Sequence, residues 1–390
     1  MKNYTAYFLI FLGLGILVVL IYLVSPFSHQ TQTFSPYALL ESSWQNYKKR
    51  FISPQGRVID YSKGDITTSE GQSYALLQAV WTDDKPTFDL VWNWTRINMQ
   101  HKKDHLFGWI WGKRPNGTYG FMPGGGNNSA SDADTDIALA LVFASRRWND
   151  SVYLNYARPI ISDLWTISVD QVNGKYYLTA GNWAKGNTVD IINPSYLAPY
   201  AWRIFAQIDP GHDWKGLIGP AYELLQSGSN ENFDKTKSVG LPPDWVAMDK
   251  KTGALHATNI PGLTTDFSFD ALRIPWRIAL DYQWNKDPRA LSYLQSLHFL
   301  SDYYSKNGKL VDGYTHDGTP ISNIENPAMY AGTLPYFQLT NPALAKQIYQ
   351  TKIISLYSND SNSFNNNLPY YEENWLWFGT AFYNHRLIPF

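Results

Sequence analysis

The chain of 390 residues contains no cysteine, which excludes disulfides, thiolate metal sites and a cysteine nucleophile together. It also lacks an excess of either charge, because 32 Lys and Arg stand against 33 Asp and Glu. Proteins that bind nucleic acid usually carry a strongly basic domain or surface, and the net charge of this chain is near zero, so we expect no nucleic-acid partner. The 8 histidines show no HExxH or similar spacing, and we therefore expect no metal and no cofactor.

Aromatic residues are abundant instead. They make up 16% of the chain and include 16 Trp and 27 Tyr. With 44% hydrophobic residues, the chain can bury a sizeable core, which excludes global disorder. Such a core does not need so many rings with polar edges. Flat aromatic faces beside polar groups suit stacking on sugars, although Trp and Tyr are also enriched at protein interfaces.

The N-terminus carries an 18-residue run without a charged side chain, residues 7–24, near the lower end of the length that crosses about 30 Å of hydrocarbon. Lys2 precedes it and no Lys or Arg follows before Lys48, so the positive-inside bias puts the rest of the chain outside the cell. A cleaved signal peptide is the alternative, but its apolar region is usually shorter, about 7–15 residues. The predicted organisation is a single-pass anchor in the cell membrane, a polar tether and one domain, at residues 1–25, 26–35 and 36–390.

From residue 36 onward, segments with helical periodicity alternate with loops, and the alternation typical of strands is scarce. Twelve helices are predicted, at about residues 36–51, 70–82, 86–101, 134–148, 151–167, 194–208, 213–228, 269–284, 287–306, 327–339, 342–357 and 373–385. This even number can pair as six hairpins. An all-α closed ring of helical hairpins is therefore the favoured architecture, although another large all-α domain has the same helix count.

Two long loops separate these helices, residues 102–131 and 229–268. The first is rich in Trp, Tyr and Gly, and the second contains the sequence LPPDWV. Loops of this length inside a compact domain usually carry function. The acidic residues of interest lie beside such loops, at predicted helix starts.

Glu70 is the first candidate. Ser69 and Gln72 match a capping box, which would place Glu70 at the first helical position, where the helix dipole lowers the pKa of a carboxyl group. A general acid needs the opposite shift, which burial among rings such as Tyr74 and Trp111 would supply. The sequence leaves this conflict open.

Asp132, Asp134 and Asp136 form the second candidate group. Their spacing resembles the opening of a calcium loop, but Ile137 and Phe143 stand where that loop requires Gly and Glu, so this interpretation fails. The three acids are either a solvated cluster in the first helical turn or a functional group, since adjacent like charges cost stability without partners.

Asp270 is the third candidate, flanked by Phe269 and near Trp276. Its simplest interpretation is an acid at a helix start, paired with Arg273 or Arg277.

Several segments resemble glycoside hydrolase family 8. Residues 130–148 match the family signature, in which A-[ST]-D-[AG]-D is followed by two residues, Ile or Met, Ala, and later Trp. TSEGQSYAL, INPSYLAP and DALRIPWRIA resemble further blocks of the family, and GWIWG resembles the paired-Trp element of its bacterial cellulose-synthesis hydrolases. The blocks fall in family order over about residues 61–285.

The resemblance implies an (α/α)6 barrel that hydrolyses internal β-glycosidic bonds with inversion. Residue by residue, it makes Glu70 the general acid, Asp270 the general base and Asp132 the carboxylate that holds the distorted sugar. Branches of the family differ in the position of the base, so three residues stand as fallback acids or bases: Asp134, Asp244 and Asp266. Substrate contacts are expected at Trp109, Trp111, Tyr61, Tyr196, Trp245 and Arg273, with core packing as the equal alternative for each ring.

The leading hypothesis is therefore a membrane-tethered, inverting, endo-acting hydrolase of a polysaccharide, linked to the synthesis or export of an exopolysaccharide of the biofilm matrix. The default substrate is β-1,4-glucan, while xylan, chitosan and an amino-sugar exopolymer remain open. A non-catalytic carbohydrate-binding or chain-guiding protein on the same barrel is the alternative, against which the retained acids argue. A lyase of similar shape is the third class, but no Tyr/His/Arg cluster stands out.

Overall fold

The computed structural model describes residues 35–233, 237–358, 361–365 and 367–390. The predicted membrane anchor, residues 1–25, lies outside the described residues, as does all but the last residue of the predicted tether. Within the described part of the chain, no helix combines the length and the apolar character that a bilayer crossing requires.

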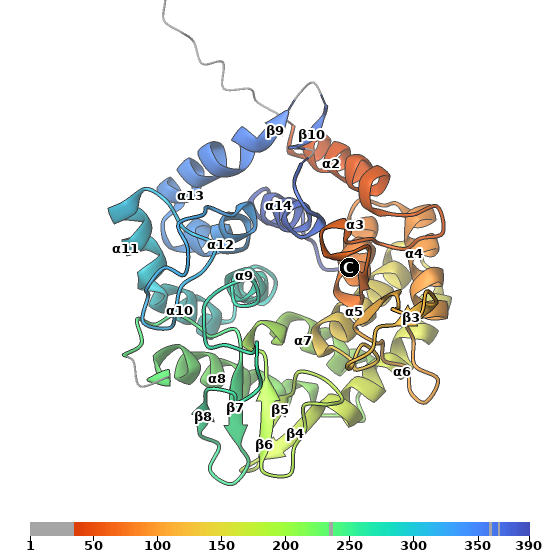
Figure 1. The fold of residues 1–390 in the computed structure, drawn as a ribbon, viewed down its shortest axis with the longest axis horizontal. Helices are drawn as coiled ribbons and strands as arrows, with labels where there is room; N and C mark the ends of the chain where they lie inside the picture. Colours follow the sequence, from red (N-terminus) through yellow and green to blue (C-terminus); the bar gives the residue numbers. More distant parts are fainter. Residues whose placement is uncertain (1–34, 234–236, 359–360, 366) are drawn as a thin grey trace, which may run out of the picture. The chain divides into compact units, whose positions relative to one another are not determined.

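The described residues form thirteen α-helices arranged as two concentric rings (Figure 1). The inner helices are α3 (Ser69–Trp81), α5 (Ser131–Arg147), α7 (Pro199–Ile208), α9 (Arg273–Asn285), α12 (Pro327–Thr340) and α14 (Tyr370–Tyr383). The outer helices are α2 (Pro36–Phe51), α4 (Lys85–Asn98), α6 (Ser151–Ser168), α8 (Ile218–Asn230), α10 (Pro288–Ser296), α11 (His298–Asn307) and α13 (Pro342–Ile348). This is the arrangement of an (α/α)6 barrel, as expected.

The two rings differ in which of their faces are apolar. The inner helix α5 is buried without interruption from Ser131 to Ala144, and a helix that is buried all round belongs in a core. The outer helix α4 buries only one stripe, which includes Phe88, Val91 and Trp92. The outer helix α4 is thus partly exposed, whereas the inner helix α5 lies within the core.

The described residues form the six helical hairpins that the sequence predicts, but several predicted helix boundaries are wrong. The predicted helix 287–306 is two helices that break at Leu297, where the backbone leaves the helical region. The predicted helix 194–208 begins as α7 only at Pro199, because proline suits the first helical turn. The predicted helix 269–284 begins at Arg273, which leaves Asp270 in the turn before it.

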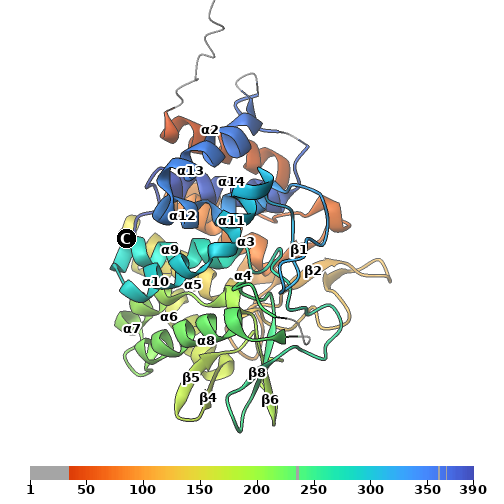
Figure 2. The ribbon, with the colours of Figure 1, turned by 90° about the vertical axis from the view of Figure 1, so that its left-hand side faces the viewer.

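Ten short strands occur in the described loops: β1 (Thr67–Thr68), β2 (Ile110–Lys113), β3 (Tyr119–Phe121), β4 (Val169–Val172), β5 (Lys175–Leu178), β6 (Val189–Ile192), β7 (Val246–Asp249), β8 (Leu255–His256), β9 (Tyr357–Ser358) and β10 (Ser363–Phe364). They pair antiparallel as β1-β2-β3, β4-β5, β6-β7-β8 and β9-β10, with Thr67 opposite Trp111 in the first sheet. Figure 2 places β1 and β2 at one end of the barrel and the C-terminus at the other. Short parts of the two predicted loops thus form strands, β2 and β3 in the first loop and β7 and β8 in the second.

Candidate active site

Glu70 lies in the first turn of α3. Thr68, not Ser69, caps this helix, because the Thr68 hydroxyl accepts a hydrogen bond from the Gly71 N–H at 3.0 Å. The predicted capping box is therefore wrong, and Gln72 instead accepts from the Val58 N–H at 2.6 Å. Glu70 becomes the second residue of the helix.

The environment of the Glu70 carboxyl group favours its protonated form. Arg273 Nη1 donates to Oε2 at 2.6 Å and the Tyr370 hydroxyl donates to Oε1 at 3.3 Å. Burial raises the pKa of Glu70 to about 7, against the opposing charge of Arg273 and with support from Asp132 and Asp270. Burial thus outweighs the helix dipole, as a general acid requires.

The three aspartates of α5 are all buried, with at most 2% of each residue exposed, so the interpretation as a solvated cluster is wrong. Asp132 Oδ2 accepts from Arg273 Nη1 at 3.0 Å, and burial raises its pKa. Asp136 accepts from both terminal nitrogens of Arg277, at 3.0 and 2.7 Å. Asp134 accepts from the Phe107 N–H at 2.9 Å. Only Asp132 lines the cavity described below.

Asp270 sits in the turn that precedes α9. Its Oδ1 accepts from Arg273 Nη2, and its Oδ2 accepts from the Trp245 indole at 2.9 Å. Arg277 is not its partner, because that guanidinium pairs with Asp136. Both carboxylate oxygens therefore have a donor, and each retains a lone pair for a further hydrogen bond.

The Asp244 carboxyl group stabilises the turn that contains Asp270 by accepting hydrogen bonds from it. It accepts from the backbone N–H groups of Ser268 at 3.1 Å and Ala271 at 2.6 Å, and also from the Ser268 hydroxyl. Burial, together with the charge of Asp270, raises the pKa of Asp244 to about 7. Asp266 contributes its backbone carbonyl, which accepts from the Asp244 N–H at 2.6 Å. Neither residue lines the cavity.

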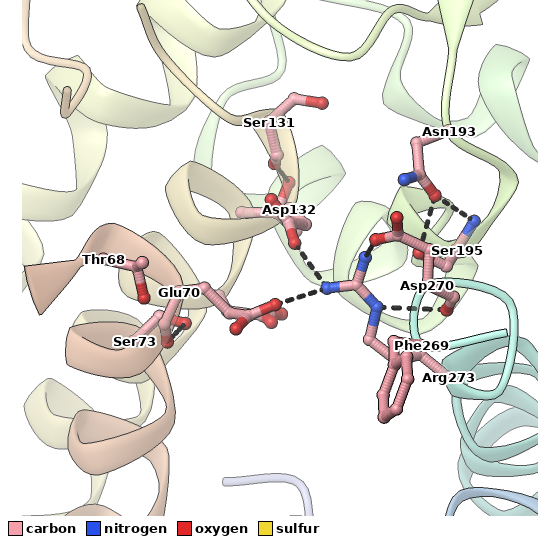
Figure 3. A network of polar contacts seen from close by, with 12 residues as sticks. Thr68, Glu70, Ser73, Ser131, Asp132, Asn193, Ser195, Phe269, Asp270 and Arg273 are labelled. Carbon is pink, nitrogen blue, oxygen red and sulfur yellow. Dashed lines mark hydrogen bonds and ion pairs between the residues drawn. The ribbon is translucent and has the colours of Figure 1, made fainter. Parts of the chain in front are cut away.

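Arg273 joins the three candidate carboxylates. Only 1% of its surface is exposed, and its guanidinium contacts Glu70, Asp132 and Asp270 at once. Figure 3 shows Glu70 and Asp270 on opposite sides of this guanidinium, with Asp132 between them. The Tyr196 ring packs 5.2 Å from the guanidinium carbon. Arginine can do this because its five N–H donors form a fixed planar fork.

The three carboxylates line a cavity of about 470 Å³. Trp109, Tyr196 and Trp245, three of the residues predicted from the sequence to contact substrate, also line this cavity. Sequence reasoning missed a further group of lining residues, for which the only signal was the pair of tyrosines that begins α14: Asp60, Ser62, Lys63, Phe269, Pro369, Tyr370, Tyr371 and Glu372.

Two predicted contacts lie elsewhere. Trp111 stacks on Tyr119 with ring centroids 5.3 Å apart, and the Arg57 guanidinium lies 4.8 Å from its ring. Its ring also meets Trp94 edge-on, so Trp111 packs in the β2–β3 hairpin and not in the cavity. Tyr61 lines a neighbouring hollow.

The sequence and the fold together identify the family. A family model described as glycosyl hydrolases family 8 matches residues 16–375. The chain belongs to glycoside hydrolase family 8. Endoglucanase A of Acetivibrio thermocellus is 32% identical over 81% of this chain and 64% of its own length, and the endoglucanase of Escherichia coli K12 is 31% identical over 75% and 74%.

A solved structure shares this fold. The endo-1,4-D-glucanase of Vibrio fischeri superposes with a TM-score of 0.72 at 25% identity, over 88% of this chain and 94% of that one. The chain spans about three fifths of the length of endoglucanase A and of two similar relatives, at 64%, 58% and 59%.

Proposed function

We propose that this family 8 member is an inverting, endo-acting hydrolase of a β-1,4-linked glucan. The observation that carries the proposal is the buried Arg273, which holds Glu70, Asp132 and Asp270 together on the wall of an aromatic-lined cavity. The relatives named endoglucanases support the endo mode and the glucan substrate.

Glu70 acts as the general acid and Asp270 as the general base. Glu70, with a pKa of about 7, holds a proton near neutral pH and gives it to the glycosidic oxygen as the bond breaks. Asp270 accepts a proton from the water that attacks the opposite face of the sugar. Inversion requires room for this water, with the two carboxyl groups about 6.5–9.5 Å apart. Their placement on opposite sides of Arg273 suits that requirement (Figure 3).

Asp132 holds the sugar that is being cleaved. Its Oδ1 has no hydrogen-bond partner among the described residues although the atom is buried. An orphaned carboxylate oxygen of this kind costs stability unless a ligand satisfies it. Asp132 also lines the cavity, where a sugar hydroxyl that donates to its carboxylate would fix the ring between Glu70 and Asp270.

Polymer digestion by the full chain in detergent tests this function. The panel contains soluble β-1,4-glucan, mixed-linkage β-glucan, xylan, chitosan and the exopolysaccharide of the host. We expect new reducing ends without ultraviolet-absorbing double bonds, and proton NMR within minutes should show the α-anomer first. Glu70→Gln should lower the rate by about 10²–10⁴-fold, whereas the matched surface variant Glu223→Gln, at a residue paired with Lys175 on the surface, should not.

The digestion experiments can contradict the inverting mechanism, the role of Glu70 and the catalytic activity separately. A β-anomer as first product means a retaining mechanism and removes Asp270 as the water activator. Full activity of Glu70→Gln removes Glu70 as the acid. Binding of polymers without any cleavage favours a chain-guiding protein.

We also propose that residues 7–24 anchor this hydrolase in the cell membrane with the barrel outside, where it trims an exopolysaccharide during synthesis or export. The support is the uncharged run after Lys2 and the absence of Lys or Arg from there to Lys48. A tether suits work on the cell's own polymer, since a scavenging hydrolase is better released. Protease treatment of intact cells should release the barrel, and complete protection would reverse the orientation.

A further inference from the structure

A second hollow, of about 410 Å³, adjoins the cavity of the candidate site. Ser62, Pro369 and Tyr370 line both spaces, so the hollow lies directly beside the cavity. The remaining wall of the hollow includes Arg50, Phe51 and Tyr61. None of the chemistry assigned above uses this space.

Tyr61 presents an aromatic surface to this hollow. It opens a short 3-10 turn, residues 61–63, which Asp60 caps by accepting from the Ser62 N–H at 2.9 Å. The turn ends at Gly64 in the left-handed region, with φ 78°. The Tyr61 ring packs against Phe51 at 6.4 Å, yet 56% of the residue stays exposed. Because the exposed Tyr61 ring packs against the buried Phe51 ring, its position is fixed and its free face can stack on a sugar ring.

Arg50 supplies the polar part of the hollow. Its Nη1 pairs with the buried Glu373, and its Nη2 donates to the Leu368 carbonyl at 2.7 Å. These contacts fix the guanidinium 4.5 Å from the Phe51 ring centroid, while 22% of the side chain remains exposed. Its other N–H groups remain as donors for hydroxyls. An aromatic face beside fixed donors is the combination that holds a sugar ring in a binding site.

The hollow joins the cavity at the end occupied by the acid. Tyr370, which lines both spaces, donates its hydroxyl to Glu70 at 3.3 Å. Asp270 instead contacts Trp245, which lines the cavity but not the hollow. A general acid protonates the oxygen of the departing chain, so sugars beyond Glu70 belong to that departing portion.

We propose that this hollow is an outer subsite for the leaving portion of the polysaccharide, in which a sugar stacks on Tyr61 and hydrogen-bonds to Arg50. The subsite rests on the proposed hydrolase function. It gives a role to the exposed tyrosine and the fixed guanidinium that both line this hollow, outside the cavity of the candidate carboxylates.

The test uses a β-1,4-linked glucohexaose labelled at its reducing end, digested by the full chain. The leaving portion carries the reducing end, so loss of its outer subsite should shift cleavage toward a shorter labelled fragment. Tyr61→Ala should also lower kcat/KM about 3- to 10-fold, mainly through KM, the size expected for one lost stacking contact. Tyr61→Phe should keep the wild-type pattern, because it keeps the ring.

Tyr37→Ala is the matched control, since Tyr37 is 61% exposed on α2 and lines neither space. An unchanged cleavage pattern in a folded Tyr61→Ala variant overturns the subsite while leaving the hydrolase function intact. A longer labelled fragment would put Tyr61 on the opposite side of the cleaved bond and also overturns it. If the wild type cleaves neither the hexaose nor any polymer of the panel, the proposed function itself fails.

Discussion

Glu70→Gln should stabilise the protein above neutral pH while removing its activity. The wild-type carboxyl group has a pKa of about 7 in the folded chain, against an ordinary value of 4.5, chiefly because it is buried. Between pH 4.5 and about pH 7, Glu70 is ionised in the unfolded chain but keeps its proton in the folded chain. The stability associated with Glu70 is therefore complete below about pH 4.5 and is lost as the pH rises to about 7.

The size of this loss follows from the two pKa values. Each pH unit between them corresponds to about 1.36 kcal/mol, which makes the total about 3 kcal/mol. Only 21% of the Glu70 side chain is exposed, so solvent screens little of it. Glutamine has the same shape, accepts the Arg273 hydrogen bond and carries no charge at any pH. The variant should thus match the wild type near pH 4.5 and exceed it by up to about 3 kcal/mol at pH 8.

Urea unfolding at pH 5 and pH 8, followed by tryptophan fluorescence, measures this difference. Other buried acids with raised pKa values, such as Asp244 and Glu373, are present in both proteins and cancel in the comparison. Glu223→Gln, at an exposed position, should show no such pH dependence. A Glu70→Gln variant that is less stable at both pH values would refute the reasoning and would make Glu70 a structural residue.

Three further outcomes are expected. Asp270→Asn should abolish hydrolysis with an unchanged circular dichroism spectrum, and activity near the wild-type level would place the base elsewhere. Asp244→Ala should lower stability by about 1–3 kcal/mol, because it leaves the buried Ala271 N–H unpaired, and should lower kcat by displacing the Asp270 turn; unchanged stability would contradict the supporting role. The rate of the wild type should fall as the pH rises through about 7, where Glu70 loses its proton, and a flat profile from pH 6 to 9 would contradict that role.

The inner and outer helices were predictable because their apolar patterns are long and Pro or Gly marks many of their ends. The short strands were not predicted, although one signal for them was present. Asn173 and Gly174 both have positive φ, 51° and 76°, in the turn between β4 and β5, and an Asn-Gly pair between two short runs is typical of such a hairpin. Two- to four-residue strands carry too little alternation to stand out by themselves.

The candidate site was partly readable from helical geometry. Residues four apart on a helix share a face, whereas residues two apart point to nearly opposite sides. Asp132 and Asp136 accordingly meet Arg273 and Arg277, which are also four apart, while Asp134 faces the Phe107 backbone. The sequence contained this matched spacing, and it would have removed Asp134 as a fallback acid.

The remaining parts of the site depend on contacts between distant segments. The Asp244 carboxyl group holds the turn of Asp270 from 24 residues upstream, and Tyr370 reaches Glu70 across 300 residues. No local pattern reports such pairings, because each depends on how the hairpins close into a ring. The resemblance to a family supplied the catalytic roles, but it did not supply the hollow around Tyr61 or the cap at Thr68.

Among the described residues, Arg273 is the one guanidinium that contacts all three carboxyl groups of the site, and its charge affects which of them is protonated. A single positive charge cannot neutralise three negative ones, so at least one carboxyl group gains by holding its proton. Asp270 has the Trp245 indole as a second donor, and the charge of Arg277 adds to that of Arg273 in opposing the effect of burial on the pKa of Asp132. Glu70 has only the longer Tyr370 contact besides Arg273. Burial raises the pKa of Glu70 to about 7, so Glu70 is the carboxyl group that we expect to hold a proton near neutral pH in the site that Arg273 assembles.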